Sequence, residues 1–234
     1  RSTLFPYTTL FRSLRYFIGL ILIGIFVGFA SGLLGVGGGF IMVPLQYFLL
    51  QSIGVESDLA MLISLGTSLA IIMPTSLSGA YRHAKTMDGI VLPGVRLGIF
   101  GIAGGVIGGM VASILSSNIL KIIFGCLLLF VAVNNLINFN KERVEAKIPF
   151  NLIFTCIIGL LVGFTSGLLG VGGGVFIIPV LTVLLGFSMI EAVGTSSIFI
   201  SLTAIGGFLS YIVSGGEFQH FHNEEIEERR VGKE

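Results

Sequence analysis

The chain has 234 residues, of which 54% are hydrophobic and 11% are charged, and its formal net charge at pH 7 is +1. A soluble globular domain is about one quarter charged, so the composition argues against a soluble protein and indicates an integral membrane protein. The small net charge and the lack of a basic cluster with interleaved aromatic residues argue against a nucleic-acid partner.

Long apolar runs predict eight helical segments after a short leader. Residues 1–13 lack the pattern of a signal peptide and are interpreted as foreign-looking sequence. The runs are too long for the alternating strands of an outer-membrane barrel, so the predicted fold class is all-α, a polytopic membrane protein. In chain order the expected helices are 14–34, 38–50, 59–81, 89–115, 118–139, 150–170, 173–187 and 190–214.

The chain contains an internal repeat. Residues 28–44, "GFASGLLGVGGGFIMVP", match residues 163–179, "GFTSGLLGVGGGVFIIP", at twelve of seventeen positions. The triplet Gly-Thr-Ser also occurs twice, at 66–68 and 194–196. We therefore predict a first transmembrane repeat over 14–140, a basic connecting loop over 141–149, a second repeat over 150–216 and a charged, foreign-looking tail over 217–234. The second repeat has no counterparts of segments 89–115 and 118–139, so it is expected to be incomplete, and a longer chain is expected to be needed for transport.

The glycine motifs are interpreted as breaks in membrane helices. Each glycine costs a helix about 1 kcal/mol relative to alanine, and residues 14–50 are too long for one simple crossing. A helix that begins at the triglycine would direct free N–H groups and a positive dipole end into a protein-lined cavity. Two such breaks at corresponding positions of two repeats indicate a transporter's substrate site. The alternative is a small-residue surface for helix packing.

Hydroxyl groups accompany the glycines in both repeats and can donate to an anion, although they can also bond to carbonyls of their own helix. The expected substrate-binding residues are Ser31, Gly35, Gly37, Gly38, Gly39, Thr67 and Ser68 in the first repeat, and Ser166, Gly170, Gly172, Gly173, Gly174, Thr195 and Ser196 in the second.

Ionisable residues are few inside the segments. Arg96 and His83 are candidate charges at the site, against the alternatives that Arg96 extends to the interface and that His83 lies in a solvated loop. No HExxH motif or carboxylate pair lies within a segment, so no enzyme activity, metal or cofactor is expected.

The orientation of the repeats depends on the path through the glycine motif. If residues 14–50 make one net crossing, the basic regions at Arg15, Arg82 and 141–149 share the cytoplasmic side. If both fragments span, the two repeats are inverted. The charges favour the first arrangement.

The pattern GFxSGLLGVGGGxxxxP followed by GTS, present in both halves, resembles the sulfite exporter TauE/SafE family of membrane transporters. The resemblance covers residues 14–216 and implies a multi-pass protein of the cell membrane, in bacteria the inner membrane, that moves sulfite, sulfonates or related organic anions. N–H groups, hydroxyls and helix N-termini independently favour an anionic substrate. The expected function is a secondary carrier in the lipid bilayer; the alternatives are an anion channel and a structural membrane protein.

Overall fold

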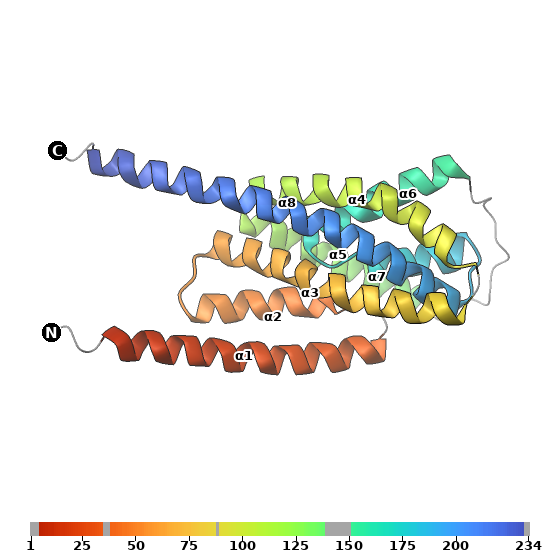
Figure 1. Ribbon diagram of the computed structural model, residues 1–234, viewed down its shortest axis with the longest axis horizontal. Helices are drawn as coiled ribbons and strands as arrows, with labels where there is room; N and C mark the ends of the chain where they lie inside the picture. Colours follow the sequence, from red (N-terminus) through yellow and green to blue (C-terminus); the bar gives the residue numbers. More distant parts are fainter. Residues whose placement is uncertain (1–4, 35–37, 88, 139–150, 232–234) are drawn as a thin grey trace.

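The computed structural model describes residues 5–34, 38–87, 89–138 and 151–231, and the regular elements in these ranges are all helical. Four helices are long and apolar enough to cross a membrane: α3, α4, α6 and the Met189–Ser214 part of α8. The predicted all-α, polytopic membrane fold is confirmed. The elements, drawn in Figure 1, are α1 (Phe5–Leu34), α2 (Gly39–Ser52), α3 (Ser57–Thr86), α4 (Val91–Ile114), α5 (Ser117–Asn138), α6 (Leu152–Leu169), α7 (Gly174–Pro179), the π-helical η1 (Val180–Leu184) and α8 (Met189–Val231).

The predicted segments differ from the observed helices mainly at the chain ends. Helix α1 begins at Phe5, inside the foreign-looking leader, and α8 continues as one helix to Val231, through most of the predicted tail. The connecting loop predicted over 141–149 lies outside the described residues.

The first glycine motif reverses the chain. A Cβ placed on Gly38 would lie 3.0 Å from Val27 Cγ1 and 3.1 Å from Ser31 Cβ, and Gly19 of α1 faces Leu49 of α2. These contacts pair the end of α1 with the start of α2 and earlier α1 residues with later α2 residues, so the two helices are antiparallel. The helix is broken at the motif as predicted, but its fragments form a hairpin instead of continuing in one direction.

The second motif forms the same hairpin. A Cβ on Gly173 would lie 3.2 Å from Val162 Cγ1 and 3.3 Å from Ser166 Cβ. These three residues follow Gly38, Val27 and Ser31 by 135 positions, so each motif brings equivalent residues together.

Helices α3 and α8, the counterparts that carry the Gly-Thr-Ser triplets, cross antiparallel. Gly66 of α3 packs on Tyr211 of α8, and Gly194 of α8 packs on His83 of α3. Tyr211 follows His83 by 128 positions, as Gly194 follows Gly66, so the two contacts are equivalent and the repeats are inverted. The arrangement favoured by the charges, with both repeats in the same orientation, is therefore wrong, because each glycine hairpin reverses the chain instead of carrying it across in one direction.

Helix α4 lies between α6 and α8 and packs closely on both (Figure 1). Gly104 and Gly108 contact the backbone of α6 at Leu160 and Phe164, while a Cβ on Gly105 would lie 2.8 Å from the Thr203 carbonyl oxygen of α8. Glycines at this spacing allow helix backbones to approach more closely than larger residues would. The glycine stripe of α4 thus joins the first repeat to the second.

Short polar contacts fix the helix ends. The Ser117 N–H at the start of α5 donates to Asp58 Oδ1 at 2.9 Å. Before α8, the Ser188 N–H donates to Glu191 Oε2 at 2.8 Å and the Glu191 N–H donates to Ser188 Oγ at 3.3 Å, which is a capping box. The carboxylates of Asp58 and Glu191 therefore cap helices at the ends of the bundle, away from its middle.

Candidate functional site

Left-handed glycines shape the two loops. Gly38 (φ +48°) precedes α2, and Gly173 (φ +75°) precedes α7, with Gly170 (φ +64°) and Gly172 (φ +77°) earlier in the second loop. L-residues with side chains rarely adopt this conformation, which accounts for the glycine runs. Gly35 and Gly37 of the predicted site lie outside the described residues.

Both loops present the start of a helix. The Gly38 carbonyl accepts from the Ile41 and Met42 N–H groups, at 3.1 and 3.0 Å. The Gly173 carbonyl accepts from Phe176 and Ile177 at the same two distances. The amides that precede these donors have no acceptor within their own helix, because the first turn of a helix leaves its N–H groups free. Each loop therefore offers N–H groups at a helix N-terminus.

The loops of the two repeats meet in the middle of the bundle. A Cβ on Gly39 would lie 3.1 Å from the Gly170 carbonyl oxygen and 3.0 Å from Val171 Cα. Ile72, at the midpoint of α3, contacts both Gly39 and Gly172. Because α3 is long enough to cross a membrane, this contact places the meeting point at the interior of the bundle. There the loops pack against each other.

Three buried hydroxyls lie on α3, α6 and α8, and two of them, on Ser68 and Ser166, lie close to the loops. Ser68 of α3, Ser166 of α6 and Thr195 of α8 are fully buried, and within the described part of the chain none of their hydroxyl oxygens has a hydrogen-bond partner. Ser166 lies against Gly173. Ser68 lies one turn before Ile72, on the face of α3 that meets the loops. Buried polar groups without partners are uncommon and are typical of sites that bind a ligand or water.

The other predicted residues differ in their surroundings. Ser196 donates its hydroxyl to the Val193 carbonyl of its own helix at 2.9 Å, which is the back-bonded alternative. Thr67 and Ser31 are half-buried, and Ser31 lies against Gly38. Gly174 is buried as the first residue of α7.

The two candidate charges lie away from the loops. Arg96 is exposed, as the sixth residue of α4. His83 is half-buried in the last turn of α3, with its Cγ 3.5 Å from a Cβ placed on Gly194. Among the described residues no group of histidine, cysteine and carboxylate side chains could hold a metal ion.

Gln46 was not among the residues predicted for the site. This glutamine of α2 is fully buried, and both polar atoms of its amide lack partners within the described residues. The signal was present, because Gln46 is the first polar side chain after the triglycine in an otherwise apolar segment. A buried amide supplies two donors and an acceptor.

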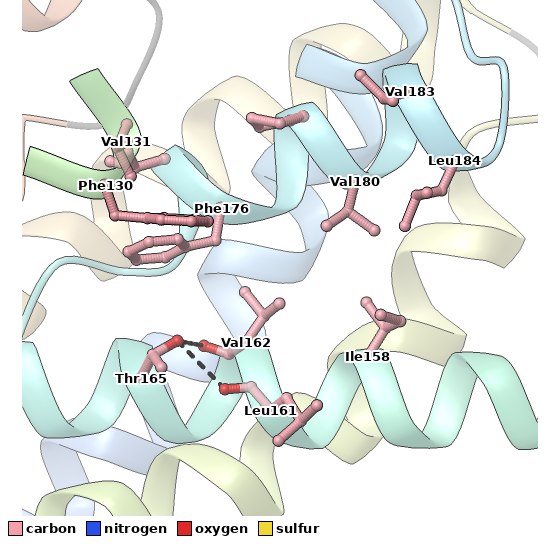
Figure 2. Close-up of a pocket in the computed structure, with 12 residues that line it drawn as sticks. Phe130, Val131, Ile158, Leu161, Val162, Thr165, Phe176, Val180, Val183 and Leu184 are labelled. Atoms are coloured by element: carbon pink, nitrogen blue, oxygen red, sulfur yellow. Dashed lines mark hydrogen bonds between the residues drawn. The ribbon is translucent and has the colours of Figure 1, made fainter. Parts of the chain in front are cut away.

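An apolar pocket of about 380 Å³ lies between α6 and the α7–η1 segment, beside the second glycine loop, with α5 on one side (Figure 2). Its walls are apolar except for Thr165, whose hydroxyl donates to the Leu161 and Val162 carbonyls of its own helix, at 3.2 and 2.9 Å. The pocket therefore offers no free donor to an anion and suits an acyl chain or apolar side chain.

Comparison with known proteins agrees with this architecture. Residues 20–222 match the family described as "Sulfite exporter TauE/SafE". A "Probable membrane transporter protein" of Haemophilus influenzae is 35% identical over 201 residues, which are 83% of this chain and 73% of that protein. Proteins of the same description from Methanocaldococcus jannaschii and Bacillus subtilis are 32% and 28% identical, covering 85% of this chain and 73% and 79% of those proteins.

No solved structure gives a significant match to the chain. The family match covers most of the chain, and the relatives are named as transporters, which points away from an enzyme. With its membrane-spanning helices, the chain is a multi-pass membrane protein, and it belongs to the sulfite exporter TauE/SafE family of membrane transporters.

Proposed function

We propose that the protein is a secondary carrier for a small anion such as sulfite or a sulfonate, bound where the two glycine loops meet. The observation that carries the proposal is the group of three fully buried hydroxyls without described partners, on Ser68, Ser166 and Thr195. Each repeat contributes to this group, so an anion with several oxygens can accept hydrogen bonds from both.

The buried donors of the bundle favour an anion over a cation. The hydroxyls, the Gln46 amide and the N–H groups that start α2 and α7 can all donate. Among the described residues up to Ser214, the carboxylates are those of Glu56, Asp58 and Glu191, which lie at or before the first turn of α3 or α8. A metal cation would therefore meet no acidic side chain at the middle of the bundle, whereas an oxyanion would meet several donors.

The inverted repeats favour a carrier. Many secondary transporters are built from inverted repeats, bind substrate near the midplane and open alternately to the two sides. Gly39 and Gly170 pack together here, so an anion can pass only if the loops separate. An anion-conducting channel is the alternative, in which exposed backbone would line a continuous path.

Vesicles that contain the purified protein test the proposal. Uptake of labelled sulfite should saturate, follow an imposed ion gradient and be inhibited by small sulfonates but not by metal cations. Uptake that rises linearly with sulfite concentration would identify a channel. Selective uptake of a cation, with sulfite and sulfonates without effect, would contradict the proposed substrate class.

A further inference from the structure

The apolar pocket beside the second glycine loop is open on one side and closed at its base. It encloses about 380 Å³ between α6 and the α7–η1 segment (Figure 2). Leu161 and Val183 line the pocket and are 55% and 41% exposed. Val162 and Val175 also line it, and each of them is only 7% exposed. The pocket therefore has a mouth at the protein surface and a floor inside the bundle.

The mouth of the pocket opens toward the lipid bilayer. Helix α6 is long and apolar enough to cross a membrane, and Ile153, Ile157 and Leu161 are each more than half exposed on it. Residues four apart lie on the same side of a helix, so these three side chains form one lipid-facing stripe. Leu161 belongs both to this stripe and to the pocket. The pocket is therefore continuous with the surface that contacts acyl chains.

The pocket is elongated along α6. Its α6 wall runs from Ile158 to Thr165, which is about 10 Å along the axis of a helix. Figure 2 shows Phe130 and Phe176 together at the end near Thr165, and Leu184 at the other end near Ile158. The long axis of the pocket is thus parallel to a membrane-spanning helix, the direction in which acyl chains lie in a bilayer. This shape suits a single hydrocarbon chain.

The walls of the pocket give water and ions nothing to bind. The lining side chains other than Thr165 are apolar, and the Thr165 hydroxyl donates to carbonyls of its own helix. A buried water molecule needs several polar partners, and apolar cavities of about 150 Å³ stay dry and take up small apolar molecules. Because this pocket is larger than such cavities and opens to lipid, we expect it to hold hydrocarbon.

The first repeat closes the equivalent space. Residues 45–49, the counterparts of η1, lie within the α-helix α2, and Gly19 of α1 packs closely on Leu49. The same positions of the second repeat form the π-helix η1, a rare conformation that is frequent at functional sites. Three of the five residues of η1 line the pocket: Val180, Val183 and Leu184. The unusual helix therefore forms one wall of the pocket.

We propose that this pocket is the binding site for one acyl chain of a membrane lipid. The chain enters from the lipid-facing stripe of α6, lies along α6 against η1, and ends beside Phe176. It supplies the van der Waals contacts that the walls of an empty pocket would lack.

The bound chain would also support the second glycine loop. A Cβ placed on Gly173 would lie 3.2 Å from Val162 Cγ1, and Val162 is part of the floor of the pocket. Val175 and Phe176, which line the same pocket, belong to the first turn of α7. A chain in the pocket therefore packs against residues that hold the loop and the start of α7.

Fluorescence quenching in phosphatidylcholine vesicles tests the proposal. The chain contains no tryptophan, so Phe176→Trp introduces a single reporter at the inner end of the pocket. Its fluorescence should be lower in vesicles whose lipid has brominated acyl chains than in vesicles of the unbrominated lipid, because bromine quenches on contact. Phe26→Trp, at a position of α1 that is 58% exposed, reports contact with bulk lipid and should be quenched to a similar extent.

A substitution that fills the pocket provides the second arm of the test. Val180 points from η1 into the pocket (Figure 2), so Val180→Phe should remove most of the quenching of the Phe176→Trp reporter. Val183→Phe is a second pocket-filling variant, with the same expected result, in case the first does not fold. The matched control is Ile153→Phe, which adds bulk at an exposed position of α6 outside the pocket and should leave the quenching unchanged.

Thermal unfolding in detergent gives an independent measurement. Added phosphatidylcholine should raise the unfolding temperature of the unaltered protein, because a ligand that binds the folded state stabilises it. The increase should be smaller for Val180→Phe and unchanged for Ile153→Phe.

Two results would overturn the proposal. If Phe26→Trp is quenched and Phe176→Trp is not, the pocket is closed in the membrane or is filled by a protein side chain. If the pocket-filling substitutions leave the quenching of Phe176→Trp unchanged, the reporter contacts bulk lipid and no chain is bound in the pocket.

Discussion

Replacing Ser68 with alanine is expected to stabilise the protein and weaken anion binding at the same time. The Ser68 hydroxyl is fully buried and has no partner among the described residues. A buried hydroxyl without a partner destabilises a protein by about 1–3 kcal/mol, and Ser68→Ala removes this group without opening a large cavity. A hydrogen bond to a charged ligand contributes about 1.5–3 kcal/mol, so its loss should weaken sulfite binding about tenfold to 150-fold.

Ser64 provides a matched control one turn earlier on α3. It is also fully buried, but its hydroxyl donates to the Ala60 carbonyl at 2.7 Å. Ser64→Ala should therefore lower the free energy of unfolding by about 0.5–1.5 kcal/mol and leave sulfite binding unchanged. The two substitutions are expected to change stability in opposite directions, and only Ser68→Ala is expected to weaken sulfite binding.

Thermal unfolding in detergent, with and without sulfite, measures both quantities. Ligand stabilisation grows with the ratio of sulfite concentration to Kd, so a titration of the unfolding temperature gives the affinity of each variant. The reasoning is refuted if Ser68→Ala unfolds as early as Ser64→Ala and binds sulfite as tightly as the unaltered protein. That result would mean that Ser68 has a structural hydrogen bond and no part in binding.

Two further predictions concern the loops. Gly170→Ala should lower the free energy of unfolding by about 2–4 kcal/mol, because φ at Gly170 is +64° and a Cβ would lie 2.8 Å from Leu65 Cα. The control is Gly125→Ala, because no described atom lies within 4 Å of a Cβ placed on Gly125. Equal unfolding temperatures for the two variants would contradict the strain argument. Cysteines that replace Ser31 and Ser166, in a background without Cys126 and Cys156, should react with a small water-soluble thiol reagent and be protected by sulfite. A cysteine in place of Ser210, which is buried and bonded to its own helix, should stay unreactive. Unreactive cysteines at both loop positions would count against a substrate site there.

The helices were predictable because membrane insertion imposes their composition. Helix α4 was expected over 89–115 and is observed over Val91–Ile114. Its limits follow from Pro93 near the start and from polar residues at the end of the apolar run. The repeat was also readable, because equivalent residues appear as identical letters at fixed offsets.

The direction of the chain after each glycine motif was not predictable. Glycine weakens a helix wherever it occurs, but the reversal depends on contacts such as that of Gly38 with Val27. Such contacts join residues that are distant along the sequence and leave no local signal. The relative orientation of the two repeats could not be predicted either, because it depends on this reversal and the loop charges differ by only a few residues between the two arrangements.

The types of residue at the candidate site could be predicted from the sequence, but which hydroxyls lack hydrogen-bond partners could not. Ser166 and Thr195 were selected from the repeat and are buried without described partners. Ser196, selected by the same argument, bonds to its own helix. Adjacent hydroxyls point in different directions on a helix, and only the packing around them decides which one is left unpaired.

The two glycine hairpins match at their loops and differ farther along their helices. In the first repeat α1 lies along α2, and Gly19 packs closely on Leu49. In the second repeat the counterpart of Leu49 is Leu184, which lines the apolar pocket that separates α6 from η1 (Figure 2). Helix α6 is held by the glycine contacts with α4, and the pocket opens on its other side.

Helix α1 has no described partner on its glycine face and rests on α2 instead. The second hairpin is therefore supported by α4 behind α6, whereas the first is supported by the contact between its own two helices.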